Sequence, residues 1–427
     1  MEFKEYKLAD ITEKIYSGGT PSTKEASYWN GELKWLSSGE TSNRFIISTE
    51  KNITQKGVEN SSTKLAFKND LVMASAGQGY TRGQTSFLKI DTYINQSLIA
   101  ISVNKDKVHP LYLFYNLISR YAELRQISDS SSTRGSINTK MIKNLNIMIP
   151  EKSHQNRIVY LINSIDEKIE INKKIIANLE ELSQTLFKRW FVDFEFPDED
   201  GNPYKSSGGE MVSSELGKIP ENWRIKTINN LLTINSGYAF KSKWWSDIGY
   251  DVIKIKDINN NSIDINNLDK VNKDYINKAA NFKVWGGEIV IALTGATAGK
   301  MGIVPKLKEV AFVNQRVGLV NSEINNVYIY NLLRSDRLRR LTLEEAIGSA
   351  QPNISPIKFG NIKVVCPSKK IINQYCQLLK HSYQKIVELY GENNYLIQLR
   401  DTLLPKLMSG ELEIPDDMEV NMDELSI

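Results

Sequence analysis

Two glycine-rich stretches that contain hydroxyl and basic side chains occupy equivalent places in the two halves of this 427-residue chain. They are residues 75–84 (SAGQGYTRGQ) and residues 293–301 (LTGATAGKM). Glycine lets a ligand approach the backbone closely, and such side chains can hydrogen-bond to phosphate oxygens or base edges. The candidate contacts are Gln78, Tyr80, Thr81 and Arg82 in the first stretch and Thr294, Thr297 and Lys300 in the second. The alternative is that both stretches are plain turns between strands.

The second stretch is close to a nucleotide-binding P-loop in composition but not in spacing. A P-loop has four residues between its first glycine and the Gly-Lys pair, and a Ser or Thr follows the lysine. Here three residues separate Gly295 from Gly299, and Met301 follows Lys300. We therefore reject a nucleotide site and favour contact with a nucleic acid.

Two further pairs of loops contain polar side chains suited to hydrogen bonds with bases or phosphates. Residues 130–136 and 348–353 precede the long helices expected below, with the candidates Thr133, Arg134, Gln351 and Asn353. Residues 17–22 and 236–241 are expected to follow the first helix of each half, with the candidates Thr20, Lys24, Tyr238, Lys241 and Lys243. Solvated loops and simple turns have the same composition, so that alternative stays open.

Two segments of the chain contain many more acidic than basic residues. The chain has 54 Lys and Arg against 50 Asp and Glu, a net charge of +4. Residues 193–222 hold eight acids and two bases, and residues 411–427 hold seven acids and no base. The rest of the chain therefore has 52 basic and 35 acidic residues, a surplus of 17 positive charges. This surplus favours a polyanionic partner over a merely solvated lysine-rich surface.

Metal, disulfide and membrane functions are not indicated by the composition. The chain has two cysteines, Cys366 and Cys376, and three scattered histidines, which predict neither a disulfide framework nor a metal site. No apolar run approaches the roughly eighteen residues of a membrane span. The N-terminus lacks the pattern of a signal peptide, so we expect a cytoplasmic protein.

The chain is a tandem duplication. Residues 182–189 (LSQTLFKR) match residues 399–406 (LRDTLLPK) at an offset of 217. Upstream the offset drifts to 219, which pairs Asn95-Gln96 with Asn314-Gln315. Each repeat is long enough to hold its own hydrophobic core. Two similar domains indicate two similar binding events.

Apolar residues spaced alternately by four and three predict one long helix at the end of each repeat. The seam residues are Ile158, Ile165, Ile169, Asn172, Ile176, Leu179 and Leu186 in the first helix and Leu379, Ile386, Leu389, Asn393, Leu396 and Leu403 in the second. Two copies in one chain favour an antiparallel intramolecular pair over homodimerisation. Such pairing could bring Asn172 to Asn393 and determine the register; the alternative is that the two amides are separately solvated.

The expected fold class is α+β, with two tandem mixed α/β domains separated by a long antiparallel two-helix coiled coil of pseudo-twofold symmetry. In the first domain, strands are expected near residues 70–74 and 98–103 and a helix near 110–124. The expected segments are a domain over 1–150, a helix over 151–192, an acidic linker over 193–215, a domain over 216–367, a helix over 368–410 and an acidic tail over 411–427.

The centre of the chain resembles the conserved central region of type I restriction-modification specificity subunits. The resemblance is found in residues 165–169 (IDEKI), 179–197 (LEELSQTLFKRWFVDFEFP), 204–212 (YKSSGGEMV) and 215–220 (ELGKIP), with Trp223. It covers the full length, because the family has the same duplicated organisation. It departs before each helix, where the family's Pro-Pro-x-x-Glu-Gln run keeps only its Pro and Gln.

The resemblance implies a non-catalytic subunit that binds double-stranded DNA and needs no cofactor. Its two globular domains would be target-recognition domains, each reading one half of a bipartite target, and their unlike polar loops predict unlike halves. The resemblance also implies two methyltransferase (M) subunits docked on the helical regions and restriction (R) subunits in the complete enzyme. Those partners would methylate adenine or cleave the DNA.

Two other functions are less well supported by the sequence. A DNA methyltransferase or nuclease with fused recognition domains would need a catalytic motif, but Asn202-Pro203-Tyr204 lacks the second proline of a base-flipping motif. The sequence also contains no glycine-rich cofactor fingerprint at the start of a helix. A coiled-coil scaffold that does not bind DNA would leave the basic duplicated domains unexplained.

A helix pair of about 35 residues would be ~50 Å long and could determine the distance between the two half-sites. Inserting one heptad into each long helix should therefore lengthen the spacer of the methylated target and leave both half-site sequences unchanged. Methylome sequencing of cells that contain the variant measures both properties. An unaltered spacer would mean that the helices do not determine the distance.

Overall fold

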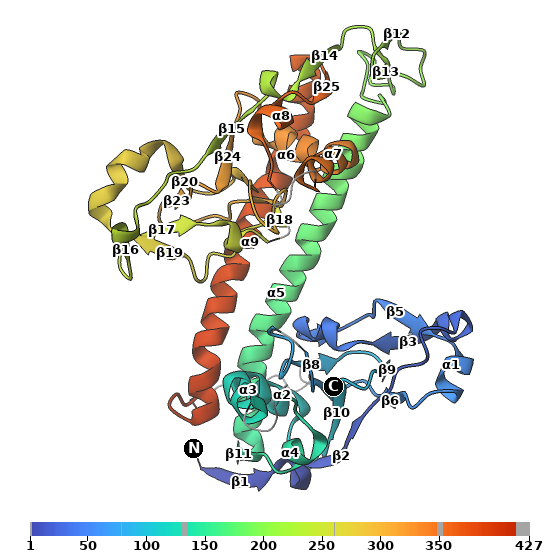
Figure 1. Ribbon diagram of the computed structural model, residues 1–427, viewed down its shortest axis with the longest axis vertical. Coiled ribbons are helices and arrows are strands. Elements are labelled where there is room, and N and C mark those ends of the chain that lie inside the picture. Colours follow the sequence, from blue (N-terminus) through green and yellow to red (C-terminus); the bar gives the residue numbers. More distant parts are fainter. Residues whose placement is uncertain (1, 78, 130–134, 260, 348–352, 416–427) are drawn as a thin grey trace. The chain divides into compact units, whose positions relative to one another are not determined.

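The computed structural model describes residues 2–77, 79–129, 135–259, 261–347 and 353–415 (Figure 1). The chain forms two compact units, the first from residues 1–167 and 399–427 and the second from residues 168–398. Two long helices, α5 (Lys152–Phe187) and α9 (Lys369–Ser409), each contribute a segment to both units. Each unit therefore combines a globular part with two helix segments.

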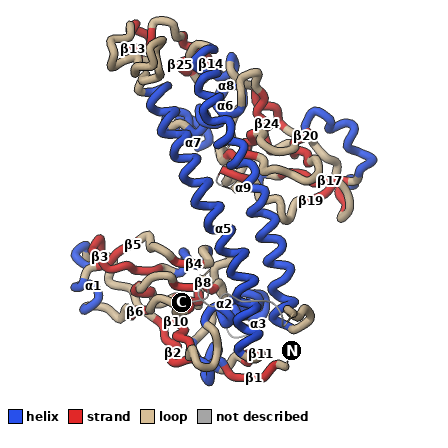
Figure 2. The backbone as a smooth tube through the Cα atoms, turned by 180° about the vertical axis from the view of Figure 1, so that it is seen from behind, coloured by secondary structure: helices blue, strands red, loops and turns tan. Residues whose placement is uncertain are grey.

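The globular part of the first unit contains two mixed sheets (Figure 2). The larger sheet has the order β2-β10-β7-β8-β4, in which β4 is parallel to β8 and the other pairs are antiparallel. The smaller has the order β5-β3-β9-β6, and β1 pairs with β11. The strands are β1 (Phe3–Lys7), β2 (Thr12–Ser17), β3 (Trp29–Leu36), β4 (Phe45–Ile46), β5 (Lys51–Ile53), β6 (Lys64–Ala66), β7 (Leu71–Ala74), β8 (Thr85–Leu88), β9 (Thr92–Ile94), β10 (Leu98–Val103) and β11 (Asn146–Pro150).

Helix α2 (Pro110–Ser119) covers the larger sheet of this unit. Pro110 occupies its first turn, and the His109 side chain accepts a hydrogen bond from the backbone N–H of Leu111, as favoured at a helix start. The single helix expected near 110–124 is in fact two, because the chain breaks at Arg120 before α3 (Tyr121–Asp129). The Arg120 guanidinium donates to the backbone oxygen of Asn146, 2.7 Å away. The short helices are α1 (Gln55–Glu59) and α4 (Thr139–Lys143).

The second unit repeats the topology of the larger sheet. Its order is β15-β24-β21-β22-β18, again with one parallel pair at the β18 edge. A second sheet has the order β16-β19-β17-β23-β20. The strands are β12 (Met211–Ser214), β13 (Gly217–Pro220), β14 (Arg224–Thr227), β15 (Thr233–Ser236), β16 (Trp245–Ser246), β17 (Tyr250–Ile253), β18 (Asn261–Ser262), β19 (Asp269–Val271), β20 (Lys283–Val284), β21 (Ile289–Ala292), β22 (Met301–Ile303), β23 (Ala311–Val313), β24 (Val317–Asn321) and β25 (Lys363–Cys366), and the helices are α6 (Asn326–Arg334), α7 (Asp336–Ile347) and α8 (Pro356–Gly360). The duplication inferred from the sequence is therefore also a duplication of strand order.

The two long helices pack against each other in antiparallel fashion in both units. In the second unit the Tyr375 hydroxyl donates to the backbone oxygen of Ser183, and the Asn172 amide donates to Asn393 Oδ1 at 3.0 Å. In the first unit Arg400 binds Asp166. The predicted pair of mixed α/β domains with two packed long helices is confirmed. The seam residues are buried at Ile158, Ile165, Ile169, Asn172, Ile176, Leu379, Ile386, Leu389 and Asn393 and half-buried at Leu179, Leu186, Leu396 and Leu403.

A buried ion cluster joins the globular part of the first unit to both helices. The Asp166 side chain on α5 is 2% exposed, and its carboxylate lies 2.6 Å from Arg400 Nη1 on α9 and 3.5 Å from Arg44 Nη1. Burial alone would lower the pKa of the Arg400 guanidinium, but Asp166 and Asp401 outweigh it and raise the pKa. For Arg44, which is closer to the sheet, burial dominates and lowers the pKa.

A corresponding cluster in the second unit uses a different carboxylate. The Glu180 carboxylate on α5 accepts hydrogen bonds from the Tyr330 hydroxyl at 2.8 Å and the Tyr390 hydroxyl at 3.1 Å. Arg334 Nη1 completes an ion pair with it at 3.1 Å. Tyr330 and Arg334 belong to α6 and Tyr390 to α9, so the carboxylate again connects the globular part to both helices.

The acidic segment after α5, which was expected to be a linker, has a folded structure of its own. The Phe196 ring stacks on Tyr204 and Trp223 with ring centroids 4.6 and 4.9 Å apart. Strands β12 and β13 then form an antiparallel hairpin. In the first unit Ile414, at the start of the acidic tail, is buried in the hydrophobic core. Within the described part of the chain, no helix is both long and apolar enough to cross a membrane.

The buried Asn172–Asn393 hydrogen bond generates a stability prediction. Asn172→Leu should lower the free energy of unfolding by about 1–3 kcal/mol, because it leaves the Asn393 amide buried beside an apolar side chain. Adding Asn393→Leu should recover most of that loss, since the buried amide pair is then removed and Glu392, the other acceptor of the Asn172 amide, keeps its ion pair with Lys168. A double-mutant cycle measured by urea denaturation tests this, with the exposed Asn178→Leu as control. If the double variant lost as much free energy of unfolding as the two single variants together, Asn172 and Asn393 would not stabilise the fold as a pair.

Candidate nucleic-acid interface

Three loops of the first unit meet at one end of its larger sheet. Strand pairing aligns the last residues of β2 and β7 with the first residues of β10, because Ser17 pairs with Ile99 and Ala74 with Leu98. The loops over 17–22, 75–84 and 95–97 therefore lie together, and we call this region the loop end of the sheet. The first of them follows strand β2 rather than the helix that was expected, because residues 12–17 pair with β10.

Backbone hydrogen bonds hold the glycine-rich loop of the first unit against its neighbours. The Ser75 N–H donates to Ser97 O at 2.8 Å, and the Ile137 N–H donates to Ser75 O at 2.8 Å. The Tyr121 hydroxyl of α3 donates to Tyr80 O at 2.7 Å. Tyr80 itself is 83% exposed. Ser75 and Tyr80 therefore have hydrogen-bonded backbone positions, and the Tyr80 side chain is open to solvent.

The Arg82 side chain, a predicted DNA contact, is buried rather than exposed at the loop end. Its side chain is 7% exposed, it forms an ion pair with Asp129, and its Nη1 donates to Gly135 O at 2.8 Å. Gly135 has a φ of 56°, and a Cβ there would lie against the guanidinium, so glycine is required at this close approach. Arg82 therefore joins the glycine-rich loop to the segment after α3. Its guanidinium is thus engaged within the protein, and its role as a DNA contact stays a prediction.

The other predicted residues of the first unit are only partly placed at the loop end. The Thr20 hydroxyl, half-buried, donates to the Gln96 side chain, and Thr81 is half-buried in the glycine-rich loop. Lys24 is exposed. Gln78, Thr133 and Arg134 lie outside the described residues. A hydroxyl, an amide and the Tyr80 phenol thus form the core of this surface.

The second unit builds the same loop end from its own residues. The Gln315 N–H donates to Tyr238 O at 3.0 Å, and the Leu293 N–H donates to Arg316 O at 3.0 Å. The Ile354 N–H donates to Leu293 O at 2.8 Å, and Thr294 forms a bridge with Asn353. These contacts are the counterparts of those around Ser75 in the first unit. The loops over 236–241 and 293–301 and the described Asn353 of the third predicted loop are therefore brought together.

The loop end of the second unit is basic and aromatic. The candidates Lys241, Lys243, Lys300 and Asn353 are exposed, Tyr238, Thr294 and Thr297 are half-buried, and Gln351 lies outside the described residues. The Tyr238 ring is parallel to Trp244, which in turn stacks on Tyr275 of the 3₁₀ segment Lys273–Phe282 with centroids 5.0 Å apart. The lysines are suited to phosphates and the hydroxyl and amide groups to base edges.

Three loop-end residues were missed by the sequence reasoning. Gln96 in the first unit and Gln315 and Arg316 in the second are exposed and precede β10 and β24. The repeated Asn-Gln dipeptide was visible in the alignment of the two halves. It could have indicated these residues, because a dipeptide retained where the offset drifts marks a shared local structure.

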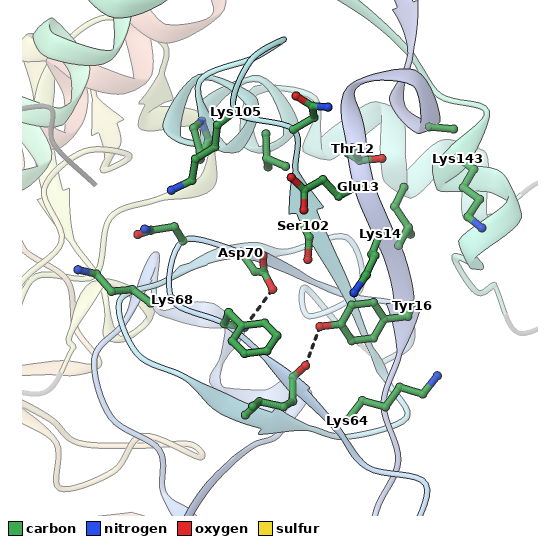
Figure 3. A pocket seen from close by; sticks show the side chains of 18 of the residues that line it. Thr12, Glu13, Lys14, Tyr16, Lys64, Lys68, Asp70, Ser102, Lys105 and Lys143 are labelled. Carbon is green, nitrogen blue, oxygen red and sulfur yellow. Dashed lines mark hydrogen bonds between the residues drawn. The ribbon is translucent and has the colours of Figure 1, made fainter.

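A hollow of about 980 Å³ lies at the opposite end of the first unit's larger sheet (Figure 3). It includes Thr12 at the start of β2 and Val103 at the end of β10, and none of the predicted contacts lines it. Burial raises the pKa of the Tyr16 hydroxyl to about 12 and also raises the pKa of Asp70. The charged residues of its wall are Glu13, Lys14, Lys64, Lys68, Asp70, Lys105, Asp106 and Lys143. The hollow is thus separate from the candidate interface.

Comparison with known proteins identifies the class. The family model for the type I restriction modification DNA specificity domain matches residues 1–181 and 220–391. The type I restriction enzyme MjaIX specificity subunit of Methanocaldococcus jannaschii is 29% identical, covering 96% of this chain and 93% of that protein. The HindI specificity subunit of Haemophilus influenzae is 25% identical, covering 96% and 100%.

A solved structure shows the same fold. The S subunit of a type I restriction-modification system from M. genitalium has a TM-score of 0.57 at 16% identity, covering 95% of this chain and 96% of that one. Two duplicated mixed domains with packed long helices are therefore a fold that this chain shares with a solved S subunit. The chain belongs to the type I restriction-modification DNA specificity family and is a specificity subunit, the non-catalytic recognition subunit of such an enzyme.

The exposed lysines of the second loop end generate a binding prediction. Lys243→Gln combined with Lys300→Gln should weaken DNA binding of the assembled complex equally for target and unrelated duplexes. The slope of log affinity against log salt should fall by about one for each lost phosphate contact. Filter binding or fluorescence anisotropy over a salt series measures both quantities.

Lys14→Gln with Lys105→Gln is the matched control, since it removes two exposed lysines at the other end of the first unit's sheet. An equal loss of affinity in the control would show that binding depends on total charge rather than on the loop end.

Proposed function

We propose that this subunit reads a bipartite, asymmetric double-stranded DNA target with one half-site per recognition domain. The target-recognition domains are residues 1–150 and 216–367. The conserved helices are residues 151–192 and 368–410, with an acidic segment over 193–215 and an acidic tail over 411–427. Because the complex would act on DNA inside the cell, we expect it to be cytoplasmic.

The observation that supports this function best is the loop end itself, which is built twice with the same strand order and different side chains. In both units the strand-pairing and backbone hydrogen bonds are equivalent, as between Ser75 and Ser97 and between Leu293 and Arg316. Equivalent positions differ in chemistry: Gly19 in the first unit's loop after β2 aligns with Tyr238 in the corresponding loop after β15. A shared scaffold with unlike polar residues suits two unlike half-sites.

The long helices are the proposed docking sites for two methyltransferase subunits. On α5, Ile171, Ile175 and Leu182 are exposed at spacings of four and seven, which place them on one face of the helix. Exposed apolar residues in such a stripe favour a protein partner over solvent. Restriction subunits would join this assembly in the full enzyme, and the methyltransferase subunits would transfer methyl groups to adenine.

Exchanging the second recognition domain tests this function. Replacement of residues 216–367 by the corresponding domain of a related specificity subunit should change one half of the methylated sequence and leave the other half unaltered. The chain is co-expressed with its methyltransferase subunits, and methylome sequencing reports the target. The reciprocal exchange of residues 1–150 is the matched control and should change the opposite half.

A continuous or symmetric wild-type target would contradict the proposal. So would a domain exchange that alters both halves at once. Loss of all methylation in both exchanges, with the complex still assembled, would mean that the domains do not act as independent readers.

A further inference from the structure

The same asparagine-capped turn precedes an inner strand of the larger sheet in both units. The turn is residues 95–97 before β10 and residues 314–316 before β24. In the first, the Ser97 N–H donates to Asn95 Oδ1 at 3.1 Å; in the second, the Arg316 N–H donates to Asn314 Oδ1 at 3.4 Å. The two turns thus share their cap and their Gln and differ in the third residue.

Backbone contacts hold that third residue in place from several sides. In the second unit Arg316 O accepts from Leu293 N–H at 3.0 Å, and the Asn314 N–H donates to Ile253 O at 3.0 Å. In the first unit Ser97 O accepts from Ser75 N–H at 2.8 Å. The third residue of the turn therefore has a fixed backbone between the sheet and the glycine-rich loop in both units.

The Arg316 side chain is exposed on this fixed backbone. Over the described ranges, no hydrogen bond, ion pair or ring contact engages its guanidinium. The buried Arg82 of the first unit is the contrast, since its guanidinium binds Asp129 and Gly135. Arg316 is thus available to a ligand without first breaking an internal contact.

We propose that Arg316 is a guanine-reading residue of the second recognition domain. A guanidinium presents two parallel N–H donors that match O6 and N7 of guanine in the major groove. This inference depends on the proposed function and specifies part of its second half-site. Ser97 stands at the equivalent place in the first unit and cannot form that paired contact, so the two half-sites differ at the base this turn meets.

The position of Arg316 within the loop end favours a base over a phosphate. Strand β24 lies between β15 and β21, so the turn occupies the inner part of the loop end. The exposed lysines Lys241 and Lys300 lie in the loops that follow those two flanking strands. Lysine is a point charge suited to phosphates, whereas the planar fork of arginine adds geometric selectivity.

The test compares Arg316→Lys, Arg316→Gln and wild type in the complex with its methyltransferase subunits. Affinity is measured for duplexes in which each base pair of the second half-site is replaced in turn, and methylome sequencing reports the target in cells. Both variants should lose about 10- to 100-fold of the discrimination at a single guanine. Recognition of the first half-site should be unchanged, which also shows that the variant is folded.

Lys300→Gln is the matched control, because it should weaken all duplexes alike and leave the guanine preference intact. Full discrimination in Arg316→Lys would overturn the inference, since a point charge would then suffice. An unchanged target in Arg316→Gln, or a wild-type second half-site without guanine, would overturn it while the bipartite function stands. A wild-type complex that recognises no bipartite target would instead contradict the function on which the inference depends.

Discussion

A buried carboxylate on α5 in each unit constrains how the globular part sits on the two long helices. Asp166 is bound by Arg44 from the first globular part and Arg400 from α9. In the second unit Glu180 connects the globular part to both helices from another position, with partners from α6 and α9. Removing one partner of a buried ion pair costs roughly 3–5 kcal/mol, because a charge is left uncompensated. Movement of either globular part on its helix segments would therefore break a strong interaction.

This constraint gives the described residues of each loop end a defined position on the sheet. The helix segments hold the globular part, the inner strands β10 and β24 are buried within it, and the loops are bonded to the ends of those strands. The strand order is the same in both units although the ion clusters differ in residue type and position. The duplicated element is thus the sheet with its loop end. The ion cluster that attaches the globular part to the helices is different in each unit.

In this arrangement the residues that stabilise the fold are different from the residues that could contact DNA. Strands β7 and β21 are buried at every residue, so substitutions there would create cavities or unpaired polar groups. The loop residues Tyr80 and Arg316 are exposed and held mainly through their backbones, so their side chains can change at little cost to folding. Such a scaffold allows the two domains of one chain to present a phenol and hydroxyls in one case and cations with aromatic rings in the other.

The duplication, the two seam helices and the central family motifs could all be predicted from the sequence, because helix periodicity and motif spacing are local properties. The presence of two such helices in one chain favoured their antiparallel pairing, and the structure decided that Asn172 lies beside Asn393 rather than in solvent. Only the tertiary structure decided that Arg82 is buried, since its partners Asp129 and Gly135 are about fifty residues away. It also decided that residues 193–222 fold as an aromatic stack and hairpin, and that Arg316 lies with the glycine-rich loop. The burial of one polar side chain and the grouping of loops depend on strand register between distant segments, which no local pattern specifies.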